Sequence, residues 1–232
     1  MKRLFIHIPK NGGSTIKSSP YTKNSFDVVV PKTVNIALGS TYLAELTKAM
    51  SKLNGTKSLN VGHARWKDIQ ESFKREKRSF AIIRNPWSRT VSRYRWATKL
   101  LQLGKMEKTH GNFSSFESFI EDRYVYGNIE YFWHRAVQGW FSQLDYVSNE
   151  DGKIVCDIMR FEHMDKDVCR YLNIETLGRP RNVTFKSTGV YTNYQKFYTP
   201  KTIQIVADWY KDDIDYWGFD FDSTATRNTT FS

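Results

Sequence analysis

The sequence predicts an α/β fold in which a central, mostly parallel sheet is flanked by helices. Apolar-rich runs at residues 4–8, 80–83 and 153–161 have the length and composition of buried strands. Segments of helical length separate these runs, and strands that alternate with helices usually pair in parallel. We find no internal repeat and no linker, so we expect a single domain over residues 1–222 and a flexible tail over 223–232.

Turn and capping signals place the other elements in order. Short strands are expected at 27–30 and 59–62, and Pro86 begins a long helix that Gly104 ends. Thr199 is placed to cap the last helix, which extends to about residues 210–215. The remaining helices are expected at residues 41–53, 66–77, 113–124, 128–144 and 162–172.

An excess of basic residues favours an anionic partner. The chain has 35 Lys and Arg residues against 24 Asp and Glu, a formal net charge of +11. Such a charge suits a nucleotide, an acidic glycan or nucleic acid, but no zinc-finger or RNP-type signature prompts a nucleic-acid partner. The two cysteines, Cys156 and Cys169, are expected to be free thiols, and no His/Cys cluster predicts a metal site.

The loop at residues 9–15 combines a lysine, two glycines and two hydroxyl residues directly after the first strand. Adjacent glycines permit left-handed dihedrals and a close approach of the backbone to a ligand. Ser14 or Thr15 can cap the next helix, which leaves N–H groups directed at one point beside Lys10. The loop is therefore either an anion site or a structural corner. It lacks the Gly-Lys-Ser/Thr of a magnesium–nucleotide loop, in which the lysine follows the glycine.

A second basic stretch begins where the strand at 80–83 ends. Arg84 is followed by Asn85, by a proline and by a helix that carries Ser92 eight residues after the arginine. Guanidinium and hydroxyl donors suit a phosphate group, whereas a solvated basic helix face would not explain an arginine at the end of a buried strand. Magnesium–nucleotide enzymes usually place an aspartate there to hold the metal, so Arg84 argues against that class.

Both stretches resemble motifs of the sulfotransferase family, which uses 3′-phosphoadenosine 5′-phosphosulfate (PAPS) and releases 3′-phosphoadenosine 5′-phosphate. Residues 7–15 resemble the 5′-phosphosulfate loop of the carbohydrate-modifying branch, except that Asn11 stands where Thr is common. Arg84 and Ser92 resemble the 3′-phosphate motif, in the usual order and at a typical spacing. The resemblance implies a P-loop NTPase-like sulfotransferase fold that requires no metal. It also implies that the cofactor is bound by Lys10, Asn11, Gly12, Gly13, Ser14, Thr15, Arg84 and Ser92.

The segment between the two motifs offers a candidate general base. His63 directly follows a predicted strand, on the ligand side of the sheet, and an imidazole can accept the proton of an acceptor hydroxyl. Some glycan sulfotransferases carry Gly-His at this place with the histidine as base. A buried structural histidine is the alternative reading of His63. Asp68 and Glu71 on the next helix are further candidate bases, and His7 is expected to pack within its strand.

The resemblance implies a sulfotransferase that moves the sulfuryl group from PAPS to an acceptor hydroxyl. His63 would remove the acceptor proton while Lys10 neutralises the charge that appears on the bridging oxygen. A carbohydrate acceptor is favoured, and the net charge suggests an acidic one; a tyrosine residue or a small metabolite stays open. Two alternatives are a divergent P-loop kinase and a basic glycan-binding protein whose transferase site has decayed. The family often recognises its acceptor where this chain has Trp133, His134, Arg135 and Gln138.

No stretch of the sequence predicts insertion into a membrane. No run approaches the roughly 18 consecutive apolar residues of a spanning helix, and the first strand begins too early to leave room for a signal peptide. Many relatives of this branch carry a Golgi anchor. We therefore expect a soluble, cytoplasmic protein of bacterial or viral origin, and a Golgi enzyme only if the chain is an excised domain.

Overall fold

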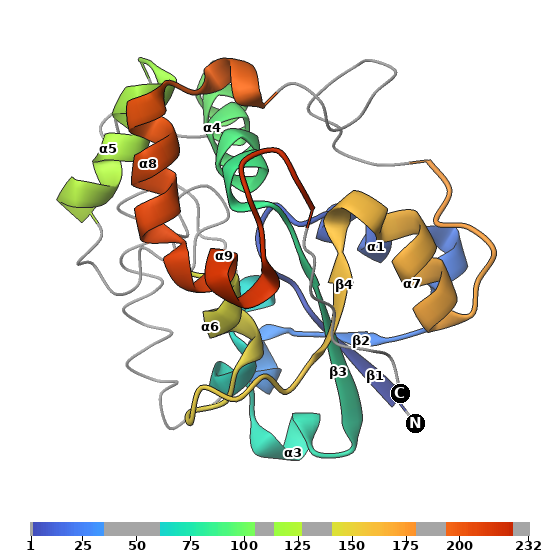
Figure 1. The fold of residues 1–232 in the computed structure, drawn as a ribbon. Coiled ribbons are helices and arrows are strands. Elements are labelled where there is room, and N and C mark those ends of the chain that lie inside the picture. The colour runs from blue at the N-terminus through green and yellow to red at the C-terminus, as the bar shows by residue number, and fades with distance from the viewer. Residues whose placement is uncertain (1, 35–60, 105–113, 127–140, 180–193, 225–232) are drawn as a thin grey trace.

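One parallel sheet forms the centre of the structure. The computed structural model describes residues 2–34, 61–104, 114–126, 141–179 and 194–224. In this part of the chain, four strands pair in the order β2-β1-β3-β4, all parallel, which confirms the predicted α/β fold (Figure 1). The strands are β1 (Lys2–Ile6), β2 (Asp27–Val28), β3 (Lys77–Ile83) and β4 (Asp157–Arg160).

The strand order creates a switch point between β1 and β3. The chain passes from β1 outward to β2 and then returns beyond β1 to form β3. Phe5 lies opposite Phe80 and Ile6 opposite Ala81, so both strands run toward the same edge of the sheet. Ligands of open parallel sheets bind at such a point, outside the carboxyl ends of the strands. The loops after Ile6 and Ile83 are therefore the segments to inspect for a site.

Helices cover both faces of the sheet because its two central strands are apolar on both sides. Leu4 and Ile6 face one core, while Phe5 and Phe80 face the other. The first core is covered by α4, α5, α6, α8 and α9, and the second by α1 and α7 (Figure 1). The helices are α1 (Gly13–Ser18), α3 (Glu71–Lys74), α4 (Pro86–Gln102), α5 (Phe116–Tyr126), α6 (Gln143–Val147), α7 (Met164–Leu172), α8 (Pro200–Trp209) and α9 (Lys211–Trp217).

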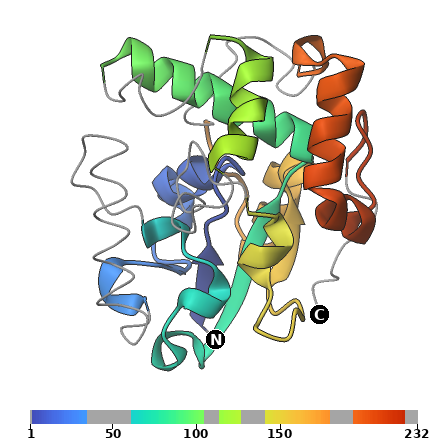
Figure 2. The same ribbon diagram turned by 90° about the vertical axis from the view of Figure 1, so that its left-hand side faces the viewer.

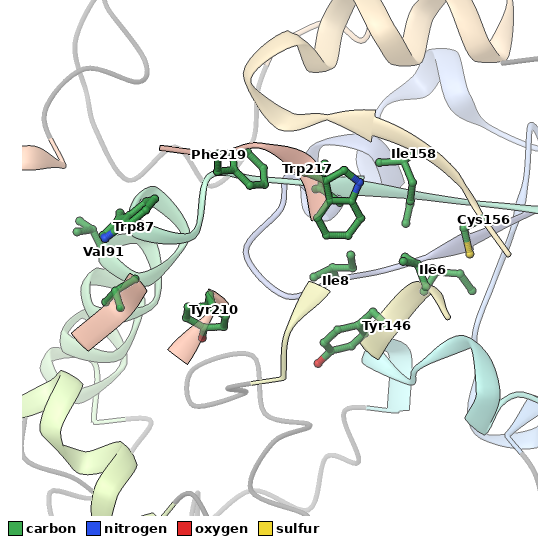
Figure 3. Close-up of a cluster of buried hydrophobic side chains, with 14 of the residues drawn as sticks. Ile6, Ile8, Trp87, Val91, Tyr146, Cys156, Ile158, Tyr210, Trp217 and Phe219 are labelled. Carbon is green, nitrogen blue, oxygen red and sulfur yellow. The ribbon is translucent and has the colours of Figure 1, made fainter. Parts of the chain in front are cut away.

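The larger core joins elements that are far apart in the sequence. Figure 3 shows residues that every layer contributes to it, and each of the five named next is at most 4% exposed. They are Ile6 of β1, Trp87 of α4, Tyr146 of α6, Ile158 of β4 and Trp217 of α9. Burying large side chains of this kind stabilises the fold by about 1.5–3 kcal/mol each. The C-terminal helices are thus part of the same core as the sheet.

Helix α4 agrees with the prediction at both ends. It begins at Pro86 and ends at Gln102, two residues before Gly104. Asn85 caps it, because its side-chain oxygen accepts from two backbone N–H groups of the first turn. The side-chain amide of Asn85 also donates to the carbonyl of Ser223, the first residue of the predicted tail. Figure 2 shows α4 across the top of the molecule, above the ends of the strands.

Two predictions for the segment before β3 were wrong. The described residues of the strand predicted at 59–62 form a 3-10 turn with His63. The helix predicted at 66–77 is a 3-10 turn followed by the short helix α3. Ile69 interrupts it by forming an antiparallel bridge with Val34. Pairing with a distant segment thus overrides local helix propensity here.

Other bounds shifted by a few residues. The strand predicted at 153–161 shortens to β4, and the last helix divides at Tyr210 into α8 and α9. Thr199 caps α8 as predicted, through a capping box. The helix predicted at 41–53 and most of the helix predicted at 128–144 lie outside the described residues.

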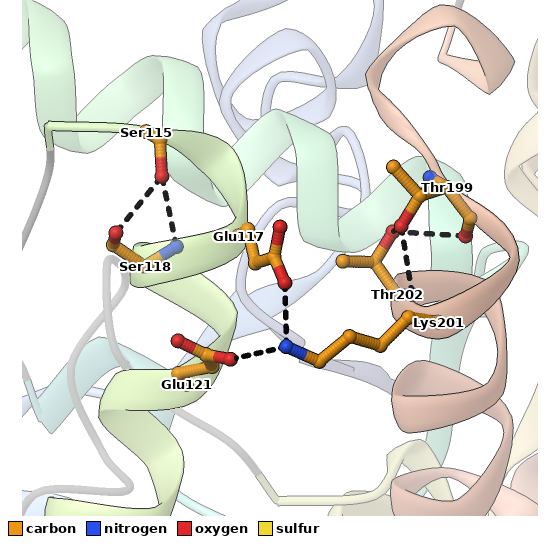
Figure 4. Close-up of polar contacts among 7 residues, drawn as sticks. All are labelled: Ser115, Glu117, Ser118, Glu121, Thr199, Lys201 and Thr202. Atoms are coloured by element: carbon orange, nitrogen blue, oxygen red, sulfur yellow. Dashed lines mark hydrogen bonds and ion pairs between the residues drawn. The ribbon is translucent and has the colours of Figure 1, made fainter.

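Polar contacts on the surface join α5 to α8. In Figure 4 the Lys201 ammonium lies between Glu117 and Glu121, 2.6 and 2.9 Å from their carboxylate oxygens. Exposed ion pairs of this kind add little stability individually. Cys156 and Cys169 are free thiols. No helix in the described ranges is long and apolar enough to cross a membrane.

Candidate active site

The loop between β1 and α1 depends on its two glycines for packing. Gly12 has a φ of 81°, and a Cβ added there would lie 2.5 Å from the Met164 sulfur. A Cβ on Gly13 would lie 2.1 Å from the ring of His7. Gly12 is also the N-cap of α1, so the prediction that Ser14 or Thr15 caps this helix was wrong. The glycines let the loop fold tightly against its own protein neighbours.

The same loop presents backbone donors that the protein does not use. The N–H groups of Gly12, Gly13 and Ser14 find no acceptor among the described residues. The N–H of Asn11 donates weakly to the Ile8 carbonyl at 3.4 Å, and that of Thr15 donates to Gly12 at 2.9 Å. Donors left open at the start of a helix suit an anion.

Lys10 brings a positive charge to this loop. Its Nζ lies 4.7 Å from the centroid of the Trp96 ring on α4. Burial lowers the pKa of Lys10 to about 7, with the charges of Arg84, Arg93 and Lys99 acting in the same direction. No ion pair joins Lys10 to a carboxylate in the described part of the chain. A lysine surrounded by cations is poised to gain from a bound anion.

Arg84 joins the end of β3 to the loop after β1. Its guanidinium donates to the Lys10 carbonyl at 2.9 Å and to the Ser88 hydroxyl at 2.7 and 3.0 Å. It lies over the Phe161 ring, 4.1 Å from the centroid, and Arg84 is 9% exposed. The structure therefore brings the two predicted motifs into direct contact. Ser92 is buried one helical turn beyond Ser88.

His63 lies at the base of the loop after β1. Its Nδ1 is 2.8 Å from the backbone oxygen of His7, and the two imidazole centroids are 4.1 Å apart. Because a carbonyl only accepts, Nδ1 carries the proton, and Nε2 of the neutral ring is the proton acceptor. Burial lowers the pKa of His63 to about 3. Lys17, Lys10 and Arg93 lower it further, while the hydrogen bond to His7 opposes them.

The other candidate bases are engaged elsewhere. Asp68 accepts from the backbone and the guanidinium of Arg65 at 2.9–3.1 Å. Glu71 is exposed and lies 3.4 Å from the Lys74 ammonium. His7 packs as predicted, although β1 ends one residue before it: its ring fills the space beside Gly13, and burial lowers its pKa well below the ordinary value. The residues predicted to contact the acceptor lie outside the described ranges: Trp133, His134, Arg135 and Gln138.

A comparison with protein-family models identifies the class of enzyme. The model described as the sulfotransferase family matches residues 2–220. The chain belongs to the sulfotransferase family. The enzyme is therefore a sulfotransferase, and this assignment favours sulfuryl transfer to a hydroxyl-bearing acceptor over the kinase and over the decayed binding protein.

Structural and sequence searches add one distant neighbour. The structure is similar to a crystal structure of a sulfotransferase from Alicyclobacillus acidocaldarius. The two chains are 13% identical, each is covered over 93% of its length, and the TM-score is 0.42. A search of curated proteins found no match.

Sulfotransferases use PAPS as the sulfuryl donor. The residues of the loop after β1 in this sulfotransferase fit an anionic group of that kind. PAPS carries negative charge at both its 5′ and 3′ positions. The loop offers open N–H donors at Gly12, Gly13 and Ser14, and Lys10 lies among cations. Open N–H donors and a lysine among cations are features of an anion-binding site. Within the described residues, no carboxylate forms an ion pair with Lys10.

One supporting residue of this sulfotransferase, Gln143, gave no recognisable signal in the sequence. The side-chain amide of Asn11 points into the protein and donates to the Ile82 carbonyl at 2.6 Å and to Gln143 at 2.7 Å. Glu162 accepts from the N–H of Asn85 at 2.9 Å, and burial raises its pKa. Single polar residues in apolar surroundings reveal such roles only when their partners are known.

Proposed function

We propose that this sulfotransferase transfers the sulfuryl group of PAPS to a carbohydrate hydroxyl, with His63 as the general base. The observation that carries the proposal is the hydrogen bond between His63 and the His7 carbonyl. The Nδ1–H of His63 is held by the His7 carbonyl, and its ring is neutral at physiological pH. A fixed tautomer with a free lone pair on the other nitrogen is what proton abstraction requires.

The residues that we assign to the cofactor lie in the two loops after β1 and β3. Lys10 and the N–H groups of Gly12, Gly13 and Ser14 hold the 5′-phosphosulfate, while Asn11 and Thr15 keep the loop in shape. Arg84 and Ser92 bind the 3′-phosphate. PAPS supplies an activated sulfuryl group on a phosphate leaving group. Lys10 stabilises the negative charge on that leaving phosphate.

The charges around His63 explain how a weak base becomes an effective one. Burial and the neighbouring cations Lys17, Lys10 and Arg93 keep its pKa far below neutrality in the free enzyme. An anion held beside Lys10 offsets those cations and raises the pKa of His63. General bases act best when their pKa approaches the working pH. The base is therefore activated by the same event that delivers the sulfuryl group.

A carbohydrate acceptor with negative charge fits the site best. The loop resembles that of the carbohydrate-modifying branch, and the charged side chains that most affect His63 are all cations. Clefts lined by one sign of charge concentrate ligands of the opposite sign. A uronate or an already sulfated sugar is the acceptor that these charges favour.

Calorimetry and turnover together test the proposal. We expect 3′-phosphoadenosine 5′-phosphate to bind in the presence of a metal chelator, and magnesium–ATP to bind far more weakly. His63→Asn should leave that affinity nearly unchanged and lower sulfate transfer by about 10²-fold or more, because it removes proton abstraction alone. The acceptor panel is an acidic polysaccharide, a neutral one, a tyrosine peptide and a simple phenol, each with radiolabelled PAPS.

The outcomes separate the parts of the proposal. If the protein binds magnesium–ATP and not 3′-phosphoadenosine 5′-phosphate, the assignment of PAPS as the cofactor is wrong. Equal losses of affinity and turnover in His63→Asn would make His63 structural. Transfer to the peptide or the phenol, with none to either polysaccharide, would overturn the carbohydrate acceptor while leaving the base in place.

A further inference from the structure

The side chain of Gln143, the first residue of α6, lies fully buried between the two anion-binding segments. Its Oε1 accepts from the Asn11 side chain at 2.7 Å and from the N–H of Arg84 at 2.8 Å. Its Nε2 donates to the carbonyl of Arg84 at 2.8 Å. One amide thus binds the loop after β1 through Asn11 and both backbone groups of Arg84.

A buried carboxylate fixes Gln143 from the other side. Asp213 of α9, which is 0% exposed, accepts from the backbone N–H groups of Gln143 and Leu144 at 2.8–3.0 Å. Its Oδ2 also accepts from Nε2 of Gln143 at 3.2 Å. The chain from Asn11 through Gln143 to Asp213 therefore connects the first loop to the C-terminal helix.

The pattern of donors and acceptors at this position requires an amide. Oε1 accepts two hydrogen bonds and Nε2 donates two, so the whole capacity of the Gln143 side chain is used. A glutamate would direct a lone pair at the Arg84 carbonyl and at Asp213. A methionine of similar size would leave the buried groups of Asn11 and Arg84 without partners, at a cost of about 1–3 kcal/mol each.

We propose that Gln143, held by Asp213, is the positioning residue that sets the spacing between the phosphosulfate loop and Arg84. The inference rests on the proposed function, because that spacing matters only if one ligand engages both segments. PAPS has anionic groups at two fixed positions, and both must be met at once. A shift of about 1 Å at either segment can cost up to about 10²-fold in rate.

The test compares two nucleotides on two variants and a matched control. Gln143→Met should weaken 3′-phosphoadenosine 5′-phosphate at least tenfold by calorimetry. Adenosine 5′-phosphate, which does not reach Arg84, should lose clearly less. Asp213→Asn keeps one acceptor oxygen and should show the same selectivity with a smaller loss. Gln70→Met removes a half-buried glutamine outside the two loops, bonded to the Val34 carbonyl at 2.9 Å, and should leave both affinities unchanged.

A double-mutant cycle separates positioning from general destabilisation. In the Arg84→Ala background, Gln143→Met should have little further effect on the affinity for 3′-phosphoadenosine 5′-phosphate, because the two residues act on one interaction. Folding is checked by circular dichroism, and Asp213→Asn replaces Gln143→Met if the latter fails to fold. A folded variant with lowered melting temperature but wild-type nucleotide affinities would overturn the inference. A wild-type protein that binds neither nucleotide would instead overturn the proposed function.

Discussion

At the scale of single residues, the ammonium of Lys10 lies among cations and over an aromatic ring. Burial and the charges of Arg84, Arg93 and Lys99 lower its pKa to about 7, so near neutral pH part of the free enzyme carries an uncharged Lys10. A bound anion favours the charged form. If the nucleotide binds beside Lys10 as proposed, its binding takes up a proton at this residue when the pH exceeds about 7.

We predict that the affinity for 3′-phosphoadenosine 5′-phosphate falls by about tenfold between pH 7 and pH 8.5. Lys10→Arg keeps its charge over this range and should flatten the dependence. Lys10→Ala should cost about 3 kcal/mol of transition-state stabilisation near pH 7, as for the loss of one oxyanion donor, and less at higher pH. Calorimetry at several pH values is the measurement. An affinity that stays level for the wild type would show that Lys10 is fully charged before binding.

Local chemistry made some residues predictable from sequence and left others hidden. Lys10 beside a glycine pair and Arg84 at the end of an apolar strand are signals confined to a few neighbouring positions. The choice of Ser88 as the hydroxyl bound by Arg84 depends on a side-chain rotamer. The role of Gln143 depends on partners 59 to 132 positions away. Such contacts exist only in the folded chain.

At the scale of elements, the loop after β1 is shaped by what packs against it. His7 directly follows β1, fills the space beside Gly13, and accepts a hydrogen bond from His63 with its carbonyl. The elements predicted well from sequence are those whose ends are marked by residues next to them in the chain. Helix α4, between Pro86 and Gly104, is an example. The segment at 66–77 was predicted wrongly because its conformation is decided by an isolated bridge between Ile69 and the distant Val34.

We predict that Gly13→Ala destabilises the protein by about 1–3 kcal/mol, because the new methyl group overlaps the His7 ring and forces it to move. Urea unfolding measures the loss. Gly62→Ala is the matched control, since its Cβ would meet only the Val29 carbonyl at 3.9 Å. Equal stability of the two variants would mean that the His7 ring can leave its place without cost.

At the scale of the whole molecule, burial of two histidines links stability to pH. The pKa values of His7 and His63 are lowered in the folded protein, so below about pH 6.5 the unfolded chain binds more protons. Their contribution to stability is therefore lost as the pH falls. Asp213 acts in the opposite sense, because burial raises its pKa to about 6 and the folded protein binds the extra proton.

We predict that His63→Gln reduces the pH dependence of the unfolding free energy between pH 6.5 and pH 4.5 by up to about 1.4 kcal/mol per pH unit. A glutamine does not bind a proton in this pH range. The contribution of residue 63 to the pH dependence of the unfolding free energy is therefore removed. Denaturant unfolding at several pH values gives the slope. His163→Gln, at an exposed position, is the matched substitution against which the slope of His63→Gln is compared. A slope in His63→Gln equal to the wild type would show that His63 is protonated in the folded protein.

The contacts of Asn85 also bear on how the enzyme is made. Its side-chain amide binds the carbonyls of Asp220 and Ser223, which follow it by 135 and 138 residues. A ribosome therefore releases the segment after β3 well before the two carbonyls that bind Asn85. Segments made early can fold early. The sheet of the nascent chain can therefore form before Asn85 has made its contacts with the C-terminal residues. We therefore expect the segment that begins α4 to reach its final form only after Asp220 and Ser223, which follow α9, have left the ribosome.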